Sequence, residues 1–167
     1  MQNNMDMQIY PLSPGDIPLA EDLAHIMIAA WKSGFQGILP SETIEKYTQF
    51  HPCADMFRQI LSSGVGRMYL AALNGKSVGL LYLLSEGDSV RIEALLTVPE
   101  VWGKGVAAAL MTQALADASS YKEITVWPFA QNHRARRFYE KHGFSPTGKT
   151  RTGDAPEMEY SRFICNL

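Results

Sequence analysis

The fold is decided by one stretch of the sequence, Ile92-Glu93-Ala94-Leu95-Leu96-Thr97-Val98-Pro99-Glu100-Val101-Trp102-Gly103-Lys104-Gly105-Val106-Ala107. It reads as an apolar strand, a short turn and the beginning of a helix. Gly103 and Gly105 allow the backbone to approach a ligand closely, and the unpaired N–H groups and dipole of a first helical turn attract phosphate oxygens. The segment therefore predicts a cradle for a pyrophosphate.

The same spacing also satisfies the dinucleotide fingerprint, as Gly103-x-Gly105-x-x-Ala108. In a dinucleotide fold the first glycine follows its strand almost directly, and an acidic residue ends the next strand about 20 positions later. Here residues 99–102 intervene, and Glu123, at about that spacing, begins its strand. A Walker loop requires Gly-Lys-Ser/Thr, which does not occur in the sequence. The context therefore disfavours both of these nucleotide folds.

The strands before this segment are predicted to form an antiparallel meander. Residues 67–73 and 77–84 are rich in β-formers and are joined by Asn74-Gly75, a dipeptide typical of a tight hairpin. A third run, 89–98, alternates regularly. Its alternation predicts one face made of Val90, Ile92, Ala94, Leu96 and Val98, and an opposite face made of Arg91, Glu93, Leu95 and Thr97.

The rest of the chain alternates helices with short strands. We expect a strand over 8–12, a helix over 16–32 with Asp16 as its N-cap, and shorter helices from Ser41 and over 54–61. After the glycine turn, the pattern predicts a helix over 104–118, a strand over 123–127, a helix over 132–142 ended by Gly143, and strands near 144–150 and 158–164. No repeat or linker interrupts the pattern, so residues 1–167 are predicted to be a single mixed α and β domain.

Composition restricts the partners and the compartment. Of 167 residues, 46% are hydrophobic and 19% charged, and the net charge of -2 argues against a nucleic-acid partner. Residues 1–8 lack the features of a signal peptide, and the apolar run 78–84 is far shorter than the roughly 20 residues of a membrane helix. Cys53 and Cys165 indicate structural thiols, and the four histidines show no metal-ligand spacing. We expect a cytoplasmic protein without a membrane partner or a metal.

Two motifs resemble the GCN5-related N-acetyltransferase (GNAT) family. Residues 102–107, after an apolar strand and Pro-Glu, are similar to its acetyl-CoA motif Q/R-x-x-G-x-G/A, with Trp102 where glutamine or arginine usually stands. Residues 127–144 look like the downstream motif N-x-x-A-x-x-F-Y-E-x-x-G-F, with Asn132 and Tyr139 at its polar positions. Seven residues are two helical turns, so these two side chains should share a face.

The resemblance implies the α/β GNAT acyl-CoA N-acyltransferase fold, a mixed, mostly antiparallel sheet flanked by helices. The sheet is expected to open between the strand ending at Val98 and the strand ending at Trp127, and to admit acetyl-CoA as co-substrate. The residues implied in binding it are Leu96, Thr97, Val98, Trp102, Gly103, Lys104, Gly105, Val106, Ala107, Asn132 and Tyr139. A basic cluster from His133 to His142 is expected either to contact its phosphates or to form a solvated helix face.

The resemblance also implies the catalytic acid, whereas the candidate base comes from the strand pattern. Tyr139 is the expected general acid that protonates the departing sulfur; the alternative is a core aromatic beside Phe138. Glu93 is a candidate base, because burial in an apolar strand would favour its neutral form; the alternative is a solvent-facing residue or an ion pair with Arg91. In some relatives the carboxylate lies twelve residues before the tyrosine, where this chain has Trp127.

The implied function is transfer of an acetyl group to a primary amine of a small molecule, a peptide N-terminus or a lysine. Residues 31–40 resemble a segment that borders the acceptor cleft, so Trp31 and Phe35 are candidate substrate-binding residues; the alternative is that they are ordinary core aromatics. Two alternatives remain: a non-catalytic acetyl-CoA-binding sensor, and a different acyl donor. A homodimer paired through an exposed sheet edge or through the C-terminal strand is a further expectation.

Overall fold

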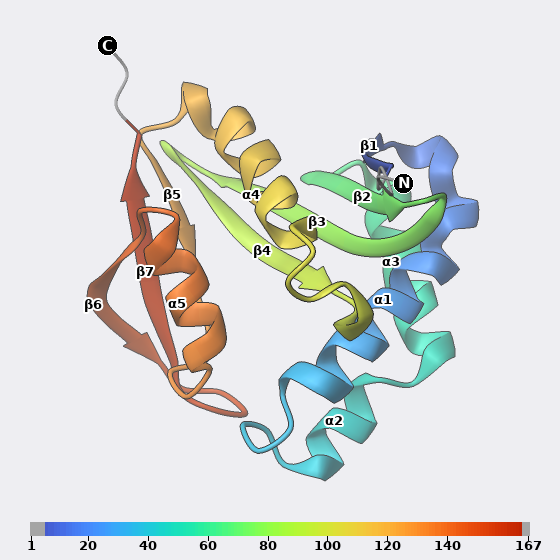
Figure 1. Cartoon of the computed structure of the whole chain (residues 1–167), viewed down its shortest axis with the longest axis horizontal. Helices are drawn as coiled ribbons and strands as arrows, with labels where there is room; N and C mark the ends of the chain where they lie inside the picture. The colour runs from blue at the N-terminus through green and yellow to red at the C-terminus, as the bar shows by residue number, and fades with distance from the viewer. Residues whose placement is uncertain (1–5, 165–167) are drawn as a thin grey trace, which may run out of the picture.

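The described chain is organised around one seven-stranded sheet. A computed structural model describes residues 6–164, and the strand order is β1-β2-β3-β4-β5-β7-β6 (Figure 1). All neighbouring strands are antiparallel except β4 and β5, which are parallel. The expected mixed, mostly antiparallel sheet is confirmed. The strands are β1 (Met7–Leu12), β2 (Arg67–Leu73), β3 (Lys76–Glu86), β4 (Ser89–Thr97), β5 (Glu123–Val126), β6 (Ser145–Arg151) and β7 (Glu157–Phe163).

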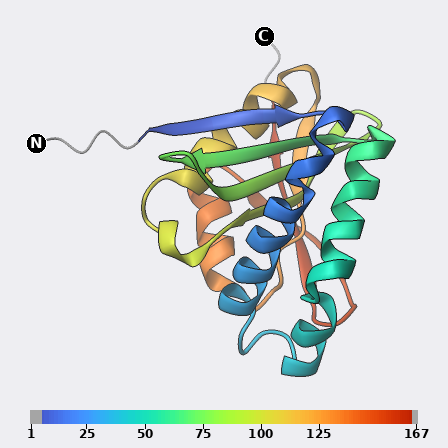
Figure 2. The same ribbon diagram turned by 90° about the vertical axis from the view of Figure 1, so that its right-hand side faces the viewer.

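Helices cover both faces of the sheet, as the sequence predicts. On one face lie α4 (Val106–Asp117) and α5 (His133–Lys141), drawn in front of the sheet in Figure 1. On the other lie α1 (Ala20–Gly34) and α3 (Phe50–Ser63), side by side in Figure 2. The short α2 (Ser41–Tyr47) follows α1, and the 3-10 turns are η1 (Pro14–Leu19), η2 (Pro99–Val101) and η3 (Ala118–Ser120). None of the helices within residues 6–164 is long and apolar enough to cross a bilayer.

The beginning of the first helical region differs from the prediction. Asp16 is not an N-cap; it lies inside η1, and the chain becomes α-helical only at Ala20. Ser13 takes the cap position, and its N–H donates to the Asp16 carboxylate over 2.7 Å. Pro18 follows within the same short helix, and because proline lacks an N–H donor, the regular α-helical ladder starts only after it.

A bulge in β4 overturns the predicted alternation of that strand. Leu83 pairs with Ile92 and Tyr82 pairs with Ala94, so Glu93 is an extra residue opposite β3. Val90 and Ile92 belong to the core beneath α4, whereas Ala94 and Leu96 pack against the core beneath α1 and α3. One inserted residue exchanges the faces of everything after it, because side chains alternate with a period of two.

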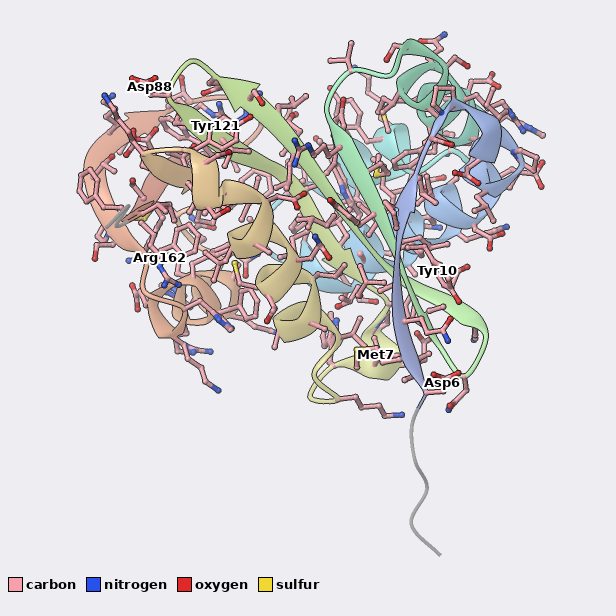
Figure 3. All side chains as sticks on the ribbon, turned by 90° about the horizontal axis from the view of Figure 1, so that it is seen from above. Asp6, Met7, Tyr10, Asp88, Tyr121 and Arg162 are labelled. Carbon is pink, nitrogen blue, oxygen red and sulfur yellow. The ribbon has the colours of Figure 1, made fainter. Side chains whose placement is uncertain are left out.

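The parallel pair β4–β5 is closed at one end and open at the other. Pairing runs from Ser89 with Glu123 to Ile92 with Val126 and then stops, and the two strands diverge in Figure 1. Asp88 and Tyr121 mark the closed end in Figure 3, where the Tyr121 hydroxyl lies 2.6 Å from that of Ser85. Beyond Val126 the chain turns toward β7, with a bridge between Phe129 and Glu157. The second half of β4 therefore lacks a partner strand on this side.

Helix α4 packs unusually close to the sheet because β3 carries a glycine beneath it. A Cβ atom on Gly79 would lie 3.1 Å from Leu110 Cδ1 and 3.2 Å from Val106 Cγ1. At the far end of α4, Tyr69 donates a hydrogen bond to the Asp117 carboxylate, and burial together with this bond raises the pKa of Tyr69 to about 12. Both contacts fix the position of the helix whose first turn follows the glycine loop.

Replacing Gly79 with alanine is expected to lower the free energy of unfolding by about 1–3 kcal/mol, the usual cost of overpacking a core. Leu110 and Val106 are almost fully buried and have little room to move. The matched control is Gly153→Ala, because no atom lies within 4 Å of a Cβ there. Urea unfolding measures both variants. Equal stability of Gly79→Ala and Gly153→Ala would show that α4 is not held at this distance by the glycine.

The two edges of the described sheet are β1 and β6. Strand β7 lies between β5 and β6, so the C-terminal strand cannot offer a free edge for pairing, contrary to one form of the homodimer expectation. Every residue of β6 is exposed. The homodimer itself stays a prediction.

Candidate functional site

Two cavities meet where β4 and β5 separate. The larger, about 440 Å³, is here called the aromatic cavity, after Trp31, Phe35, Trp127 and Phe129 in its wall. The smaller, about 300 Å³, is called the cradle cavity and is lined by Thr97, Trp102, Ala107 and Arg134 among others. The residues common to both walls are Phe35, Leu95, Leu96, Asn132, Ala135 and Tyr139. A ligand in one cavity can therefore reach a ligand in the other.

The glycine loop lies between Trp102 and Ala107, which both line the cradle cavity. Gly103 and Gly105 have φ values of 78° and 85°, which side chains with a Cβ rarely adopt. Gly105 caps α4, and the first helical hydrogen bond runs from the Ala109 N–H to the Gly105 carbonyl over 3.0 Å. The amides of residues 106–108 have no acceptor within the helix. Free amides at a helix N-terminus are the geometry that anion binding requires, and the phosphate cradle itself stays a prediction.

Trp102 connects the loop to α5. The Arg134 guanidinium lies 3.4 Å from the centroid of the Trp102 ring, a cation–π contact between the two walls of the cradle cavity. Arg136 instead donates to the Tyr160 hydroxyl over 3.0 Å and to the Ala130 carbonyl over 2.9 Å. The basic cluster thus divides, with Arg134 at the cavity and Arg136 holding α5 in place.

Tyr139 stands in the wall between the cavities. Its side chain is only 7% exposed, and burial raises the pKa of Tyr139 well above its ordinary value, so the phenol stays protonated at neutral pH. Within residues 6–164 the Tyr139 hydroxyl has no hydrogen-bond partner. Every described side-chain nitrogen or oxygen that is fully shielded from solvent does have one, so this hydroxyl is not fully shielded. The Tyr139 hydroxyl therefore opens onto the site. Its ring packs edge-on to Phe138 and Phe144, as the interpretation of a core aromatic requires. The role of Tyr139 as general acid stays a prediction.

Helix α5 is anchored at both ends, which fixes Tyr139. At its start, Asn132 Oδ1 accepts a hydrogen bond of 3.1 Å from the Ala135 N–H as the N-cap. At its end, Arg162 of β7, labelled in Figure 3, donates to the His142 carbonyl over 2.8 Å. The structure thus shows a capping role for Asn132 in addition to its place in both cavity walls.

Residues from distant parts of the chain together close one side of the aromatic cavity. Trp31 and Phe35 at the end of α1 contact edge to face, with ring centroids 5.1 Å apart, and Phe35 meets Phe129 at 5.0 Å. A small apolar cluster of Leu39, Ile44 and Ala155 packs beside these rings. The loop between β6 and β7 therefore helps α1 and α2 to cover the open end of the β4–β5 pair.

Charged residues line one side of the aromatic cavity in ion pairs. Glu93 Oε2 accepts from Arg91 Nε over 2.9 Å, and Arg91 also pairs with Glu86. The Glu93 side chain is 44% exposed. The expected burial of Glu93 is therefore wrong, because the bulge turns it outward, and the alternative of an ion pair with Arg91 is confirmed. A second pair joins Arg151 and Glu157 over 3.0 Å.

The structure brings most of the predicted site residues together. Around the cradle cavity lie Leu96, Thr97, Trp102, Ala107, Asn132 and Tyr139, with Phe35 between the cavities. Glu93 and Trp31 line the aromatic cavity. Five described residues that the sequence connects with the cofactor line neither cavity: Val98, Gly103, Lys104, Gly105 and Val106. The Val98 N–H donates to the Val78 carbonyl, and Val106 is buried in the core, so these two support the loop from behind.

The sequence did not identify much of the aromatic cavity. Tyr82 on β3, Met56 and Ile60 on α3, and the Arg151–Glu157 pair come from elements that carry no motif. Phe129 alone had a usable signal, because it follows directly on a strand that borders the predicted opening. Cys53 is buried with a free thiol, whereas Cys165 lies outside the described residues. Within residues 6–164, no group of three His, Cys, Asp or Glu side chains is placed to hold a metal ion.

Comparisons with known proteins agree with this geometry. The family model described as "Acetyltransferase (GNAT) family" matches residues 26–144. An uncharacterized N-acetyltransferase of Mycobacterium tuberculosis is 30% identical over 136 residues, covering 80% of this chain and 86% of the relative. An uncharacterized N-acetyltransferase of Archaeoglobus fulgidus is 31% identical over 102 residues, covering 56% and 69%.

Solved structures share the fold. A PaiA N-acetyltransferase from Thermoplasma acidophilum, in complex with coenzyme A, aligns with a TM-score of 0.79 at 20% identity, covering 96% of this chain and all (100%) of that chain. An aminoglycoside 6'-acetyltransferase type Ii aligns with a TM-score of 0.74 at 15% identity, covering 96% and 99%. At these identities the likeness concerns the fold.

Proposed function

The chain belongs to the GNAT family of acetyltransferases, as its two motifs predicted, and on that premise we propose that it moves the acetyl group of acetyl-CoA directly to a primary amine. One observation carries the proposal: Tyr139, a buried phenol with an unpartnered hydroxyl among the described residues, lies in the wall shared by two cavities. One cavity has an anion-binding helix terminus and the other has not. This is the arrangement that a donor with a pyrophosphate and an acceptor without one require.

The donor fits the cradle cavity. The amides of residues 106–108 at the start of α4 suit the pyrophosphate, and Arg134 adds a cation beside them. The second half of β4, which has no partner strand on the β5 side beyond Ile92, offers backbone groups to the amide groups of the pantetheine arm, in the manner of an added strand. The structure solved with coenzyme A shares this fold.

The proposed reaction needs no covalent enzyme intermediate. The neutral amine attacks the thioester carbonyl carbon, a C–N bond forms, and the C–S bond breaks. The departing sulfur takes the proton of the Tyr139 hydroxyl, and the nitrogen loses one proton to the solvent. The Tyr139 phenolate takes one proton back from the solvent, so the enzyme returns to its starting state. The products are an N-acetyl amide and the free coenzyme thiol. The raised pKa of Tyr139 keeps the acid protonated until the sulfur leaves.

The direct test is acetyl-CoA-dependent release of thiol, with the acetylated amine identified by mass spectrometry. The amines should include small molecules, peptides with a free N-terminus and lysine derivatives. Amine-dependent thiol release with a matching acetyl product supports the transferase. Saturable binding of acetyl-CoA without an acetylated product from any amine would contradict turnover and favour a coenzyme sensor instead. Competition with other acyl-CoA molecules tests the choice of donor.

We propose Glu93 as the group that accepts the proton of the incoming ammonium, directly or through water. Glu93→Gln should lower kcat/KM by about tenfold at neutral pH, at the modest end of acid–base effects. The deficit should shrink as the pH rises toward about 10.4, the reference pKa of an alkylamine, because the free amine no longer needs a base. Glu86→Gln is the matched control. This substitution removes the other carboxylate on Arg91, and Glu86 does not line either cavity. A Glu93→Gln deficit that is absent, or equal at all pH values, refutes the assignment.

We propose further that residues 1–167 form one N-acetyltransferase domain. A cytoplasmic location belongs to the same proposal, because the buried Cys53 thiol suits a reducing compartment.

A further inference from the structure

The aromatic cavity has an apolar body. Aromatic rings form one side of it, and Met56, Ile60 and Phe57 of α3 form another. Its volume of about 440 Å³ is within the range of small-molecule sites. Side chains of this kind favour a ligand that buries a ring or a branched hydrocarbon, because removing about 100 Å² of apolar surface from water contributes roughly 2–3 kcal/mol.

The charges that line this cavity are balanced. Its ionised side chains are two guanidinium groups and two carboxylates, and each carboxylate is already paired: Glu93 with Arg91, and Glu157 with Arg151. Glu86, outside the cavity, adds one further carboxylate on Arg91. The whole cluster carries one negative charge in excess, counted over Arg91, Arg151, Glu86, Glu93 and Glu157.

Arg91 is shared between Glu86 and Glu93, so the Glu93 carboxylate in the cavity wall is only partly neutralised and can pair with one ammonium. A second ammonium entering the aromatic part would lose its hydration without a carboxylate to replace it, which is costly. A carboxylate on the ligand would meet arginines whose positive charge is already matched by the carboxylates of Glu93 and Glu157. Glu93, on the bulge of β4, and Tyr139 both line this cavity, so the nitrogen belongs beside these two residues and the apolar body against the rings.

We infer that the acceptor is a primary monoamine with a bulky apolar body, best represented by an arylalkylamine. The inference rests on the proposed function and specifies its substrate class. The amine nitrogen becomes the amide nitrogen and loses one proton, while the coenzyme leaves as the thiol. Polyamines, aminoglycosides and free amino acids do not satisfy the same cavity.

The test compares kcat/KM for 2-phenylethylamine, phenylalanine, 1,4-diaminobutane and kanamycin with the full chain and acetyl-CoA. 2-Phenylethylamine should exceed 1,4-diaminobutane and kanamycin by about 30-fold, the equivalent of one buried ring. It should also exceed phenylalanine, which has the same ring, because the arginines of the cavity are already paired with carboxylates and offer no uncompensated charge to a further one. A higher value for the diamine, the amino acid or kanamycin overturns the inference while the transferase stands. Calorimetric binding of 2-phenylethylamine to the coenzyme A complex separates the two proposals. Binding without acetylation refutes the proposed function alone, and an absence of binding refutes the substrate class.

A charge placed in the apolar wall gives a second test. Met56 lines the aromatic cavity from α3 and is 39% exposed, so a polar substitute does not have to be buried. Met56→Glu should reduce the preference for 2-phenylethylamine over 1,4-diaminobutane by about tenfold, because the second ammonium gains a partner. Met56→Gln, the matched uncharged variant, should keep the larger part of that preference. Equal ratios in both variants, with unchanged melting temperatures, would show that the acceptor does not occupy this cavity.

Discussion

Replacing Tyr139 with phenylalanine will lower kcat by about 100-fold or more, the usual contribution of a positioned general acid. The affinity for coenzyme A should change little, because the ring and its contacts with Phe138 and Phe144 remain. The hydroxyl has no hydrogen-bond partner within residues 6–164, so its removal also leaves no other described group unsatisfied. Stopped-flow or steady-state thiol release measures kcat, and calorimetry measures the affinity.

The matched control for this variant is Tyr121→Phe, which removes a hydroxyl at the closed end of the β4–β5 pair and touches neither cavity. Its kcat should equal that of the natural protein. A Tyr139→Phe variant with full kcat would show that the sulfur receives its proton from another donor. A variant with weaker coenzyme binding and unchanged kcat would show that the hydroxyl binds the donor but does not act as an acid.

The pH profile follows from the same residue. A general acid acts only while protonated, and burial raises the pKa of Tyr139 above the ordinary tyrosine value of about 10. The rate should therefore rise with pH as the acceptor amine loses its proton, and it should not decline again below about pH 10. An alkaline decline with a midpoint near pH 8 would assign the proton to a different group.

Replacing Ala107 with glutamate will weaken binding of acetyl-CoA by about 100-fold or more. Ala107 lies in the first turn of α4 and lines the cradle cavity. A carboxylate there competes with the pyrophosphate for the helix terminus and also repels it. At close range and with little screening by solvent, this repulsion costs several kcal/mol. The same substitution favours the helix, since an acidic residue in the first turn stabilises it by about 0.3–1 kcal/mol. Binding and stability should therefore change in opposite directions.

Ala107→Gln serves as the control, because it adds nearly the same volume without charge. It should weaken binding by less than the glutamate, and the difference between the two measures the electrostatic part. Calorimetry gives the dissociation constants, and thermal unfolding gives the stabilities. Equal dissociation constants for both variants would show that the cradle cavity does not receive a phosphate. A glutamate variant that unfolds at a lower temperature would contradict the described first turn.

Local signals in the sequence were sufficient for much of the fold. Asn74 and Gly75 have φ values of 52° and 80°, as the predicted hairpin requires, and β2 has the predicted bounds. The glycine loop and α5 were predicted from their motifs. Each motif contains residues that a turn requires and residues that recur at helical spacing. The helix predicted over 54–61 is longer: α3 begins at Phe50, with Pro52 in its first turn, where an N–H is not needed.

The rest depends on contacts between residues that are distant in the chain. The bulge at Glu93 has no marker of its own, because any residue type can be the extra one in such a bulge. For that reason the alternation of β4 was predicted wrongly and Glu93 was expected to be buried. The order of β7 and β6 and the place of Arg151 and Glu157 depend on which strand joins the edge of the sheet. Trp31, Phe35 and Phe129 are distant in the chain, and they come together only once the strands have paired in this order.

The splayed β4–β5 pair makes the enzyme modular. The wall of the cradle cavity comes mainly from residues 95–107 and 132–139, together with the end of α1. The wall specific to the aromatic cavity comes from α1, α3, β3, the first part of β4, residues 126–129 and the β6–β7 hairpin. Evolution and laboratory selection can therefore vary the residues that line only the aromatic cavity while those that line the cradle cavity stay intact. A combinatorial library restricted to Met27, Met56, Ile60, Leu84 and Phe129 would sample new acceptors without altering a residue that lines the cradle cavity.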